Sequence, residues 1–335
     1  MKRVFVSGGL GFMGSDFIRY LFEIDPTIEV LNFDKMTYAG NPANVASVAG
    51  KARYRFVKGD IANPRDVRAA FKRFKPDLVV NFAAETHVDR SILDPSAFIT
   101  TDVAGTQVLL EAVREFGTAK YIQISTDEVY GSIERGTFTE DSPLKPNSPY
   151  AASKAGGDLM VRAYVKTYKV PAITTRSCNN FGPHQYPEKL IPLFITNLLE
   201  GKKVPLYGSG NNVREWIYVR DHSRAVWLLA TKGKIGEVYN IGTGYERSNL
   251  VLTDLLLGLT GKTKTEIQRV ADRPGHDLRY ALDTKKIARL GFRPSVSFEE
   301  GLSQTVAWYQ ANQPWWKKIK AGQYRAYYRK NYTKR

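Results

Sequence analysis

The chain has a single cysteine among its 335 residues, which excludes an internal disulfide framework and indicates a protein of a reducing, cytoplasmic compartment. No apolar run approaches the roughly 18 residues of a membrane-spanning helix, and the residues after Met1 read as a strand rather than a signal peptide. Cys178 lacks the context of an activated thiol, so we interpret it as a small core residue. The histidines lack the spacing of metal ligands, and we expect no metal at His87, His184, His222 or His276.

Acidic residues are few relative to basic ones: 33 Asp and Glu against 49 Lys and Arg give a formal net charge of +16, which raises the question of nucleic-acid binding. Eight of the basic residues lie between Lys317 and Arg335, interleaved with aromatic residues and without a single acid. Such a tail can be a stacking surface for single strands or a docked helix with a solvated basic face. Because no nucleic-acid-binding motif occurs elsewhere, we favour the helix and expect no nucleic-acid partner. A substrate with two phosphates accounts for part of the basicity.

The first half of the chain alternates short apolar runs with amphipathic stretches. Strands are predicted at Arg3–Ser7, Glu29–Phe33, Tyr54–Lys58, Leu78–Phe82, Tyr121–Ser125 and Ala172–Arg176. Helices are predicted at Phe12–Glu23, Pro64–Phe74, Ala97–Phe116 and Tyr150–Tyr168. This alternation is typical of an α/β fold with a Rossmann-like, doubly wound parallel sheet.

After residue 176 the pattern becomes irregular, and strand-helix character returns only at about residues 215–241. We therefore expect residues 1–176, joined by 215–241, to form the sheet domain that binds a cofactor. Residues 177–214 and 242–335 are expected to form a smaller, C-terminal substrate-binding lobe that does not fold independently.

Glycines cluster directly after the first predicted strand. Gly8 permits a tight turn, Gly11 a close approach of the backbone to a pyrophosphate, and Gly14 close packing of helix on strand. The helix that follows offers its N-terminal N–H groups to phosphates. Asp34 ends the next strand, where a carboxylate accepts hydrogen bonds from a ribose 2′-hydroxyl and repels a 2′-phosphate. We therefore expect NAD rather than NADP, a preference that the neighbouring Lys35 slightly weakens. The other expected cofactor contacts are Phe12, Met13, Thr37, Asp60, Ile61, Ala83 and Ala84.

Polar residues that suit acid-base chemistry follow the fifth predicted strand. Thr126-Asp127-Glu128 ends that strand, and Tyr150 and Lys154 follow at the i, i+4 spacing of one helical face. A free tyrosine has a pKa near about 10, so Tyr150 acts as a base only if positive charge from Lys154 and a nicotinamide ring stabilises its anion. Oxidation of an alcohol alone does not require the two carboxylates. Two neighbouring acids with opposite roles need unequal environments, which the sequence does not reveal.

Segments along nearly the whole chain resemble the extended short-chain dehydrogenase/reductase superfamily, and within it the nucleoside-diphosphate-glucose 4,6-dehydratases, chiefly those acting on dTDP-glucose. The resemblance covers Gly8–Ser15, Asp34–Asn41, Ala83–Ile92, Ser125–Gly131, Tyr150–Lys154, Asn179–Pro192, Tyr207–His222 and Asp272–Asp283. Its most discriminating part is Thr126-Asp127-Glu128. Similar 4-epimerases carry small or hydroxyl residues in place of the two carboxylates, and GDP-mannose dehydratases and UDP-glucuronate decarboxylases typically keep only the glutamate.

The resemblance implies a catalytic set of five residues. Tyr150, supported by Lys154, would take the proton of the sugar's C4 hydroxyl while its hydride passes to NAD, with Thr126 bonded to the same oxygen. Glu128 would remove the C5 proton, and Asp127 would protonate the departing C6 hydroxyl. The hydride would return to C6, so that the product is a 4-keto-6-deoxy sugar nucleotide and the cofactor ends as it began.

The resemblance also implies contacts with the sugar nucleotide, although ordinary salt bridges or core packing are the alternative for each. Near the sugar and diphosphate it places Glu85, His87, Asn179, Lys189 and Leu190. On the nucleobase and phosphate side it places Pro205, Tyr207, Arg214, Asn249, Arg273 and His276, with the two arginines as bidentate phosphate ligands.

The chain departs from the family pattern at Asp102, where the superfamily usually has an asparagine tied to a backbone kink and a proton relay. Thr86 and Ala151 replace usual serines. Superfamily members commonly pair the helices predicted at Ala97–Phe116 and Tyr150–Tyr168 across a two-fold axis, so we expect a homodimer. The alternatives left open are a UDP-glucose 4,6-dehydratase, an NAD-dependent 4-epimerase, and a nucleic-acid-binding protein that merely retains the fold.

Overall fold

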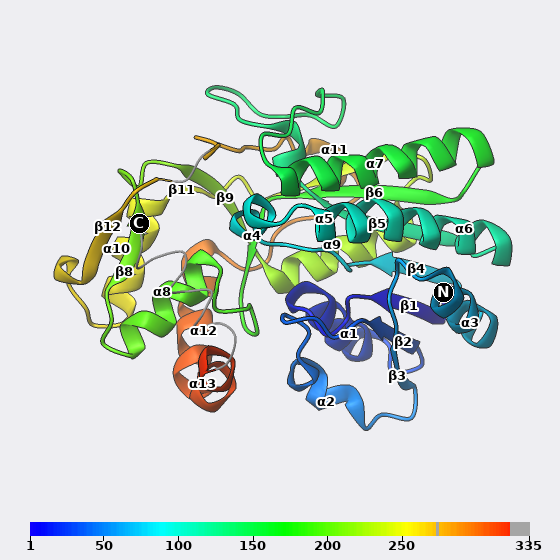
Figure 1. The fold of residues 1–335 in the computed structure, drawn as a ribbon, viewed down its shortest axis with the longest axis horizontal. Coiled ribbons are helices and arrows are strands. Elements are labelled where there is room, and N and C mark those ends of the chain that lie inside the picture. Colours follow the sequence, from blue (N-terminus) through cyan, green and yellow to red (C-terminus); the bar gives the residue numbers. More distant parts are fainter. Residues whose placement is uncertain (273–274, 322–335) are drawn as a thin grey trace.

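A seven-stranded parallel sheet forms the larger part of the molecule (Figure 1). In the computed structural model, which describes residues 1–272 and 275–321, its strand order is β10-β6-β5-β4-β1-β2-β3. The strands are β1 (Arg3–Ser7), β2 (Glu29–Asp34), β3 (Tyr54–Lys58), β4 (Leu78–Asn81), β5 (Lys120–Thr126), β6 (Ala172–Ser177) and β10 (Val238–Ile241). The direction of winding reverses between β1 and β4, and ligands of such sheets bind in the crevice outside the carboxyl ends at that point.

Helices cover both faces of this sheet because its strands are apolar on both sides. Val4 and Val6 of β1 pack into one buried cluster, together with helices α1 (Phe12–Ile24) and α9 (Val219–Lys232). Phe5 between them points to the opposite cluster, formed with α3 (Pro64–Phe74), α6 (Thr106–Phe116) and α7 (Pro149–Tyr168). The doubly wound α/β fold predicted from the sequence is thereby confirmed. Each of the six predicted strands matches an observed strand to within one residue at either end.

The helix predicted over Ala97–Phe116 is interrupted. It consists of α5 (Ser96–Phe98), a π-helical segment over Ile99–Gly105 and then α6. A Cβ atom on Gly157 of α7 would lie 2.8 Å from the carbonyl oxygen of Asp102, so the widened turn packs directly on a glycine of the neighbouring helix. The periodicity of the sequence did not indicate this widening, which depends on contact between helices far apart in the chain.

A smaller lobe beside the sheet has its own buried core (Figure 1). Its strands are β7 (Asn179–Phe181), β9 (Val213–Tyr218) and β11 (Glu246–Ser248) in one sheet, and β8 (Val204–Tyr207) with β12 (Ile267–Val270) in another. Its helices are α8 (Leu190–Leu199), α10 (Asn249–Leu259), α12 (Phe298–Ala311) and α13 (Gln313–Ala321). Since β9 belongs to this lobe, the chain rejoins the large sheet with α9 and β10 rather than at residue 215. The division into two lobes at the expected boundaries stays a prediction.

Short helices complete the chain, namely α2 (Ala46–Ala49), α4 (Val88–Leu93) and α11 (Lys285–Arg289). Within the residues described, no helix has both the length and the apolar character that crossing a bilayer requires. The same residues contain no cluster of three or more His, Cys, Asp or Glu side chains suited to a metal ion.

Candidate active site

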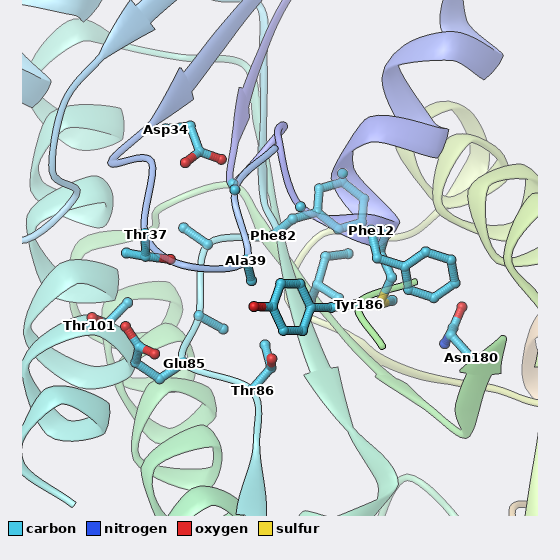
Figure 2. Close-up of a pocket in the computed structure, with 18 of the residues that line it drawn as sticks. Phe12, Asp34, Thr37, Ala39, Phe82, Glu85, Thr86, Thr101, Asn180 and Tyr186 are labelled. Atoms are coloured by element: carbon cyan, nitrogen blue, oxygen red, sulfur yellow. The ribbon is translucent and has the colours of Figure 1, made fainter. Parts of the chain in front are cut away.

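A pocket opens at the carboxyl ends of the parallel strands, where the winding reverses, and the segment that follows β6 closes its far side (Figure 2). Every residue that the sequence singled out for cofactor binding lines this pocket, and so do all five of the catalytic set. Local motifs at the ends of β1, β2, β3, β4 and β5 meet there because the carboxyl ends of parallel strands share one edge of the sheet.

The turn after β1 is shaped for a close ligand. Gly8 has a φ of 69°, and a Cβ atom on it would lie 2.6 Å from the backbone nitrogen of Ala83, so only glycine fits. A Cβ on Gly14 would clash with the carbonyl oxygen of Gly8, which fixes the close packing of α1 on this turn. Gly11 begins α1 without any side-chain cap from the described residues. The N–H groups of the first turn are therefore left for an anionic ligand, and the pocket fits a dinucleotide.

Asp34 ends β2 at the pocket with its carboxylate already oriented by the backbone. Its Oδ2 accepts the N–H of Leu10 at 2.9 Å, and its Oδ1 accepts the N–H of Met36 at 2.7 Å. A carboxylate has lone pairs beyond these two, so it can also accept ribose hydroxyls. The adjacent Lys35 ammonium lies 2.6 Å from Oδ2 of Asp60, so its charge is directed to that carboxylate. The structure therefore gives little support to the expectation that Lys35 weakens the preference for NAD over NADP.

Asp127 and Glu128 begin a short 3₁₀ helix, Asp127–Tyr130, directly after β5. Thr126 caps it: its Oγ1 accepts the N–H of Glu128 at 3.3 Å and donates to Oδ1 of Asp127 at 3.1 Å. The two neighbouring carboxyl groups point into different surroundings, since Asp127 is 1% exposed whereas Glu128 is half-buried at the pocket wall.

The surroundings of Asp127 favour the protonated form of its carboxyl group. Burial raises the pKa of its carboxyl group well above the usual value, and the charges of Glu128 and Glu215 raise it further. A hydrogen bond from Thr126 and the charge of Arg214 only partly offset this rise. Its Oδ2 has no hydrogen-bond partner in the described part of the chain, so this oxygen is available to exchange a proton with a bound ligand. The unequal environments that the sequence required but did not assign are thus present.

Tyr150 and Lys154 lie one turn apart near the start of α7, as the spacing predicted. Burial raises the pKa of Tyr150 well above 10, and the charges of Glu128, Asp102 and Asp127 add to the rise, against which a hydrogen bond with Thr126 acts. The protein groups alone therefore hold this phenol protonated. The Lys154 ammonium donates to the carbonyl oxygen of Ile124 at 2.7 Å, on the strand beside the pocket.

Asp102, the departure from the family pattern, lies behind this pair. Its Oδ2 accepts a hydrogen bond of 2.7 Å from Oγ of Ser153, the residue between Tyr150 and Lys154 on the same helix. Burial raises the pKa of Asp102 to about 6, although the charge of Lys154 and the Ser153 hydrogen bond act in the opposite direction. An asparagine at this position would have no such titration.

Of the residues expected to bind the sugar nucleotide, four line the pocket: Glu85, Thr126, Asn179 and Lys189. Figure 2 shows Glu85 on the lower side of the pocket. His87 is buried just behind the wall, with Nε2 3.3 Å from the carbonyl oxygen of Glu188, and burial lowers its pKa to about 3. Leu190 begins α8 next to Lys189.

The remaining expected contacts lie in the smaller lobe, outside this pocket. Pro205 and Tyr207 are on β8, and the Tyr207 hydroxyl bonds Oδ2 of Asp89 at 3.2 Å. Asn249 begins α10 with its Oδ1 buried and unpartnered among the described residues. His276 bonds Asp272 through Nδ1 at 2.6 Å, while Arg273 lies outside the described residues.

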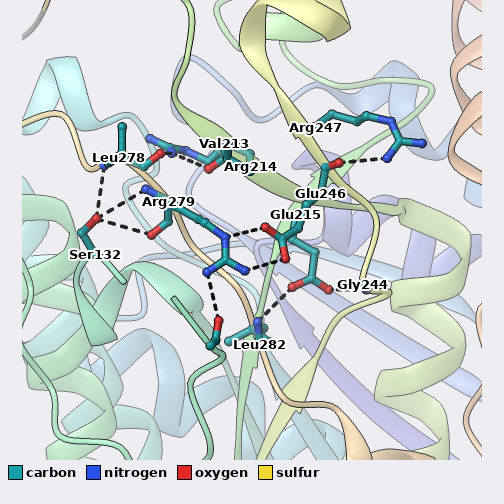
Figure 3. A network of polar contacts seen from close by, with 11 residues as sticks. Ser132, Val213, Arg214, Glu215, Gly244, Glu246, Arg247, Leu278, Arg279 and Leu282 are labelled. Atoms are coloured by element: carbon teal, nitrogen blue, oxygen red, sulfur yellow. Dashed lines mark hydrogen bonds and ion pairs between the residues drawn. The ribbon is translucent and has the colours of Figure 1, made fainter. Parts of the chain in front are cut away.

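Arg214 is occupied by the protein itself. Its Nη2 donates to the carbonyl oxygen of Asp277 at 3.0 Å, its Nη1 donates to that of Val213 at 2.8 Å, and its guanidinium lies 4.4 Å from the ring centre of Tyr280. Figure 3 shows this arginine beside Glu215 within a network of polar contacts that joins β9, β11 and the segment before α11. These bonds use Nη1 and one hydrogen of Nη2; within the described residues, Nε and the second Nη2 hydrogen remain for the bidentate phosphate contact expected from the sequence, which stays a prediction.

Several pocket residues were not singled out from the sequence. They include Tyr38, Asn44, Asn180, Gln185, Tyr186 and Trp315. Tyr38 belongs to a segment that the resemblance covers, which was a usable signal. Trp315 comes from α13, more than three hundred residues after the glycine turn, and no local pattern indicates its position.

The fold and the pocket together define a Rossmann-fold enzyme of the short-chain dehydrogenase/reductase type, with a Tyr/Lys pair beside a dinucleotide turn. More narrowly, the model of the GDP-mannose 4,6 dehydratase family matches residues 5–305, and the chain belongs to that family.

Relatives with a more specific name cover nearly the whole chain. A dTDP-glucose 4,6-dehydratase of Streptomyces griseus is 50% identical over 317 residues, which are 94% of this chain and 96% of that relative. The solved structure of DesIV, a dTDP-glucose 4,6-dehydratase from Streptomyces venezuelae with NAD and TYD bound, matches with a TM-score of 0.93. It is 52% identical and covers 95% of this chain and 100% of its own. A UDP-glucose 4-epimerase of Thermus thermophilus in complex with NAD is less similar, with 31% identity, a TM-score of 0.86 and coverage of 92% and 99%.

Proposed function

We propose that this protein is an NAD-dependent lyase that dehydrates dTDP-D-glucose to dTDP-4-keto-6-deoxy-D-glucose. The observation that carries the proposal is the buried Asp127 beside Glu128, in one pocket with Tyr150 and Lys154; burial raises the pKa of the Asp127 carboxyl group. An epimerase needs only the oxidising half of this set, so the carboxyl pair favours dehydration. The similarity to dTDP-glucose 4,6-dehydratases at about half identity, against 31% for a UDP-glucose 4-epimerase, points the same way.

Bound NAD supplies a hydride acceptor for C4 of the sugar, a positive charge beside Tyr150, and later the same hydride for C6. The glycine turn and the N-terminus of α1 bind its pyrophosphate, and Asp34 accepts the adenosine ribose hydroxyls. Tyr150 takes the C4 hydroxyl proton, and Thr126 holds the same oxygen through its own hydroxyl. Because the charges of Glu128 and Asp102 disfavour the tyrosinate, this proton transfer depends on the cationic ring and on Lys154.

Elimination then uses the unequal acids. Glu128 removes the C5 proton, which the new C4 ketone has acidified, and Asp127 gives its proton to the departing C6 hydroxyl, which leaves as water. Glu128 returns its proton to C5 as the hydride reaches C6. This role requires an Asp127 that holds a proton at neutral pH, and the rise in its pKa caused by burial supports it.

The sugar lies against Glu85 and Asn179 in this proposal, with Lys189 toward the diphosphate. The nucleobase is assigned to the smaller lobe, against Pro205 and Tyr207. Asn249, expected on the phosphate side, has an unpartnered buried oxygen as far as the described residues go. The other expected contacts, Leu190, Arg214, Arg273 and His276, belong to the same proposal.

A homodimer in the cytoplasm completes the proposal. Several apolar residues of helices α6 and α7 belong to the chain's own core, namely Leu109, Leu110, Val113, Val161 and Tyr164. Large apolar side chains nevertheless remain exposed on the adjacent helical elements, with Leu159 of α7 at 55% and Ile99 of the π-helical segment at 54%. A monomeric mass at micromolar concentration would contradict the dimer, and Leu159→Arg should weaken it.

Mass spectrometry after incubation with nucleoside-diphosphate-glucose tests the activity directly. Loss of one water from dTDP-glucose without added reductant supports dehydration. An unchanged mass with inverted C4 supports epimerisation, and faster turnover of UDP-glucose supports the uridine enzyme. Absence of turnover together with salt-sensitive DNA binding would support a nucleic-acid-binding protein.

A further inference from the structure

The loop between β2 and α2 forms one wall of the cofactor pocket through Thr37, Ala39, Gly40 and Asn41. Figure 2 shows Thr37 and Ala39 on one side of the pocket and Tyr186, from the segment before α8, close to them. We name residues 35–45 the cofactor loop. Two hydrogen bonds tie this loop to parts of the chain that lie more than one hundred residues away.

Glu188 makes the first tie. The hydroxyl of Tyr38 donates to its Oε1 at 2.9 Å. Its Oε2 accepts Nε and Nη2 of Arg90 at 3.0 and 2.9 Å, and the Arg90 guanidinium in turn lies 3.8 Å from the ring centre of Tyr38. Glu188 is 3% exposed, so the ion pair is shielded from water and from salt. Tyr38 is thus held by its hydroxyl and by its ring face at once.

Trp315 makes the second tie from the opposite end of the loop. Its Nε1 donates to Oδ1 of Asn44 at 3.1 Å, while the Asn44 amide donates to the carbonyl oxygen of Leu10 in the glycine turn at 2.9 Å. The indole is fixed by edge-on packing against Trp308, with ring centres 5.1 Å apart. One tryptophan of the C-terminal helix α13 is therefore linked through Asn44 to the turn expected to bind the pyrophosphate.

We propose that Glu188 and Trp315 are positioning residues that hold the cofactor loop closed, so that one NAD molecule stays in the pocket for a whole turnover. The inference rests on the proposed function, because that reaction uses the same cofactor twice. A pocket that opened between the two hydride transfers would release an oxidised sugar and end the cycle unfinished. The two ties lie at either end of the loop, and the loop opens fully only when both are broken.

The expected increase in the rate of loop opening follows from the loss of the two hydrogen bonds. A hydrogen bond of this kind contributes enough that its loss speeds opening by about twofold to tenfold. Because the ties lie on different elements and share no partner, their effects should multiply in a double variant.

The first experiment measures NAD dissociation from the holoenzyme without substrate, by stopped-flow exchange against excess cofactor. Tyr38→Phe removes only the hydroxyl and keeps the ring, and Trp315→Phe removes the indole donor together with part of the ring that packs on Trp308. Each should release NAD about twofold to tenfold faster, and the double variant by the product of the two. The control is Glu200→Gln, whose carboxylate bonds Lys320 and Lys202 within the smaller lobe. Dissociation at the wild-type rate in Tyr38→Phe and Trp315→Phe, or equal acceleration in Glu200→Gln, overturns the proposal.

A double-mutant cycle separates the tie from any direct contact between Tyr38 and the cofactor. In a Glu188→Ala background, Tyr38→Phe should add no further acceleration, whereas an undiminished effect there would contradict a role through Glu188. A second readout is the partition of turnover: the variants should release free 4-keto-glucose nucleotide alongside the dehydrated product. If wild-type protein fails to dehydrate dTDP-glucose, the proposed function fails, while the dissociation rates still decide whether the ties hold the cofactor.

Discussion

Buried polar groups differ in their hydrogen bonding between the carboxyl edge of the large sheet and the polar network around Glu215 in the smaller lobe. At the sheet edge, Oδ2 of Asp127 is buried and has no partner within the described residues. In the smaller lobe, Glu215 is equally buried, yet its carboxylate accepts the N–H groups of Thr243, Gly244 and Leu282 at 2.5, 2.8 and 3.1 Å. Arg214 beside it donates to backbone carbonyls (Figure 3). The edge therefore keeps unused hydrogen-bonding capacity for a ligand, whereas the network uses its capacity to hold three chain segments together.

The difference has an energetic meaning. An unpartnered buried polar atom costs about 1–3 kcal/mol, so the edge is less stable than it would be if filled with matched residues. Active sites commonly carry such a cost, because the groups that react must be available and aligned before the substrate arrives. Substitutions at the edge should therefore change chemistry more than stability, and those in the network should do the reverse.

The largest effect is expected for Tyr150→Phe. Without the phenol, the first proton has no acceptor, so reduction of bound NAD by dTDP-glucose should fall by about 10³-fold, within the usual range for a lost general base. The measurement is single-turnover absorbance of the reduced cofactor. Thermal stability should change little, and a phenylalanine variant that reduced NAD at the normal rate would remove Tyr150 from the mechanism.

Glu128→Gln and Asp127→Asn should separate oxidation from elimination. Both variants keep Tyr150 and Thr126, so they should still bind substrate and form some reduced cofactor, while overall dehydration falls by about 10²-fold or more. Rapid-quench mass spectrometry should reveal accumulated 4-keto-glucose nucleotide. If Glu128→Gln dehydrated dTDP-glucose at the wild-type rate while Tyr150→Phe was inactive, the carboxyl pair would be a bystander and epimerisation the better description.

These two predictions were available from the sequence because their residues lie in short local motifs. The glycine turn, Asp34 and the Tyr150/Lys154 spacing each depend on a few neighbouring residues, and the shared edge of a parallel sheet brings such motifs together. The strands were equally accessible, since apolar runs of strand length alternate with amphipathic helices. What the motifs did not show is which carboxyl group carries the proton, because that depends on burial by segments distant in the chain.

The smaller lobe was harder to predict for the same reason. Strands β7 and β11 have three residues each, too short for a periodic pattern. Tyr38 and Trp315 reach the pocket only through tertiary packing, and Asp277, whose carbonyl oxygen bonds Arg214, lies more than sixty residues later in the chain. The sequence therefore indicated candidate phosphate ligands in this lobe but not the bonds that already occupy one of them.

Glu215→Gln tests the network side of the comparison. The amide keeps one acceptor but turns a donor toward backbone N–H groups, so at least one buried N–H loses its partner. The free energy of unfolding should fall by about 1–3 kcal/mol, measured by urea denaturation. The matched control Glu299→Gln removes an exposed ion pair with Arg247 and should cost about 0–1 kcal/mol. If both variants lost the same free energy of unfolding, the buried network would stabilise the fold no more than an exposed ion pair does.

Asp127→Asn should have the opposite effect on stability at neutral pH. The folded protein raises the pKa of Asp127 well above its unfolded value of about 3.9, so above that pH the folded state binds more protons than the unfolded state. Wild-type stability should therefore fall as pH rises through this window, by up to about 1.4 kcal/mol per pH unit. The asparagine variant lacks this slope, and the gap between the two stability curves should widen with pH. Parallel curves would show that Asp127 ionises normally.

The smallest effect is expected for Lys35→Ala. This variant tests whether a charge at the sheet edge affects cofactor binding when it already has a partner in the protein. Lys35 lies at the sheet edge and lines the pocket, but its ammonium pairs with Asp60 at 2.6 Å, and its side chain is 56% exposed. An exposed charge that already has a partner contributes about 0–1 kcal/mol, so the ratio of NAD to NADP affinity, measured by titration calorimetry, should shift less than about fivefold. Asp34→Ala removes the buried carboxylate that repels a 2′-phosphate and should shift the same ratio far more. A large shift in the affinity ratio for Lys35→Ala would contradict the comparison. It would mean that a residue at the sheet edge affects the cofactor even when its charge is already paired within the protein.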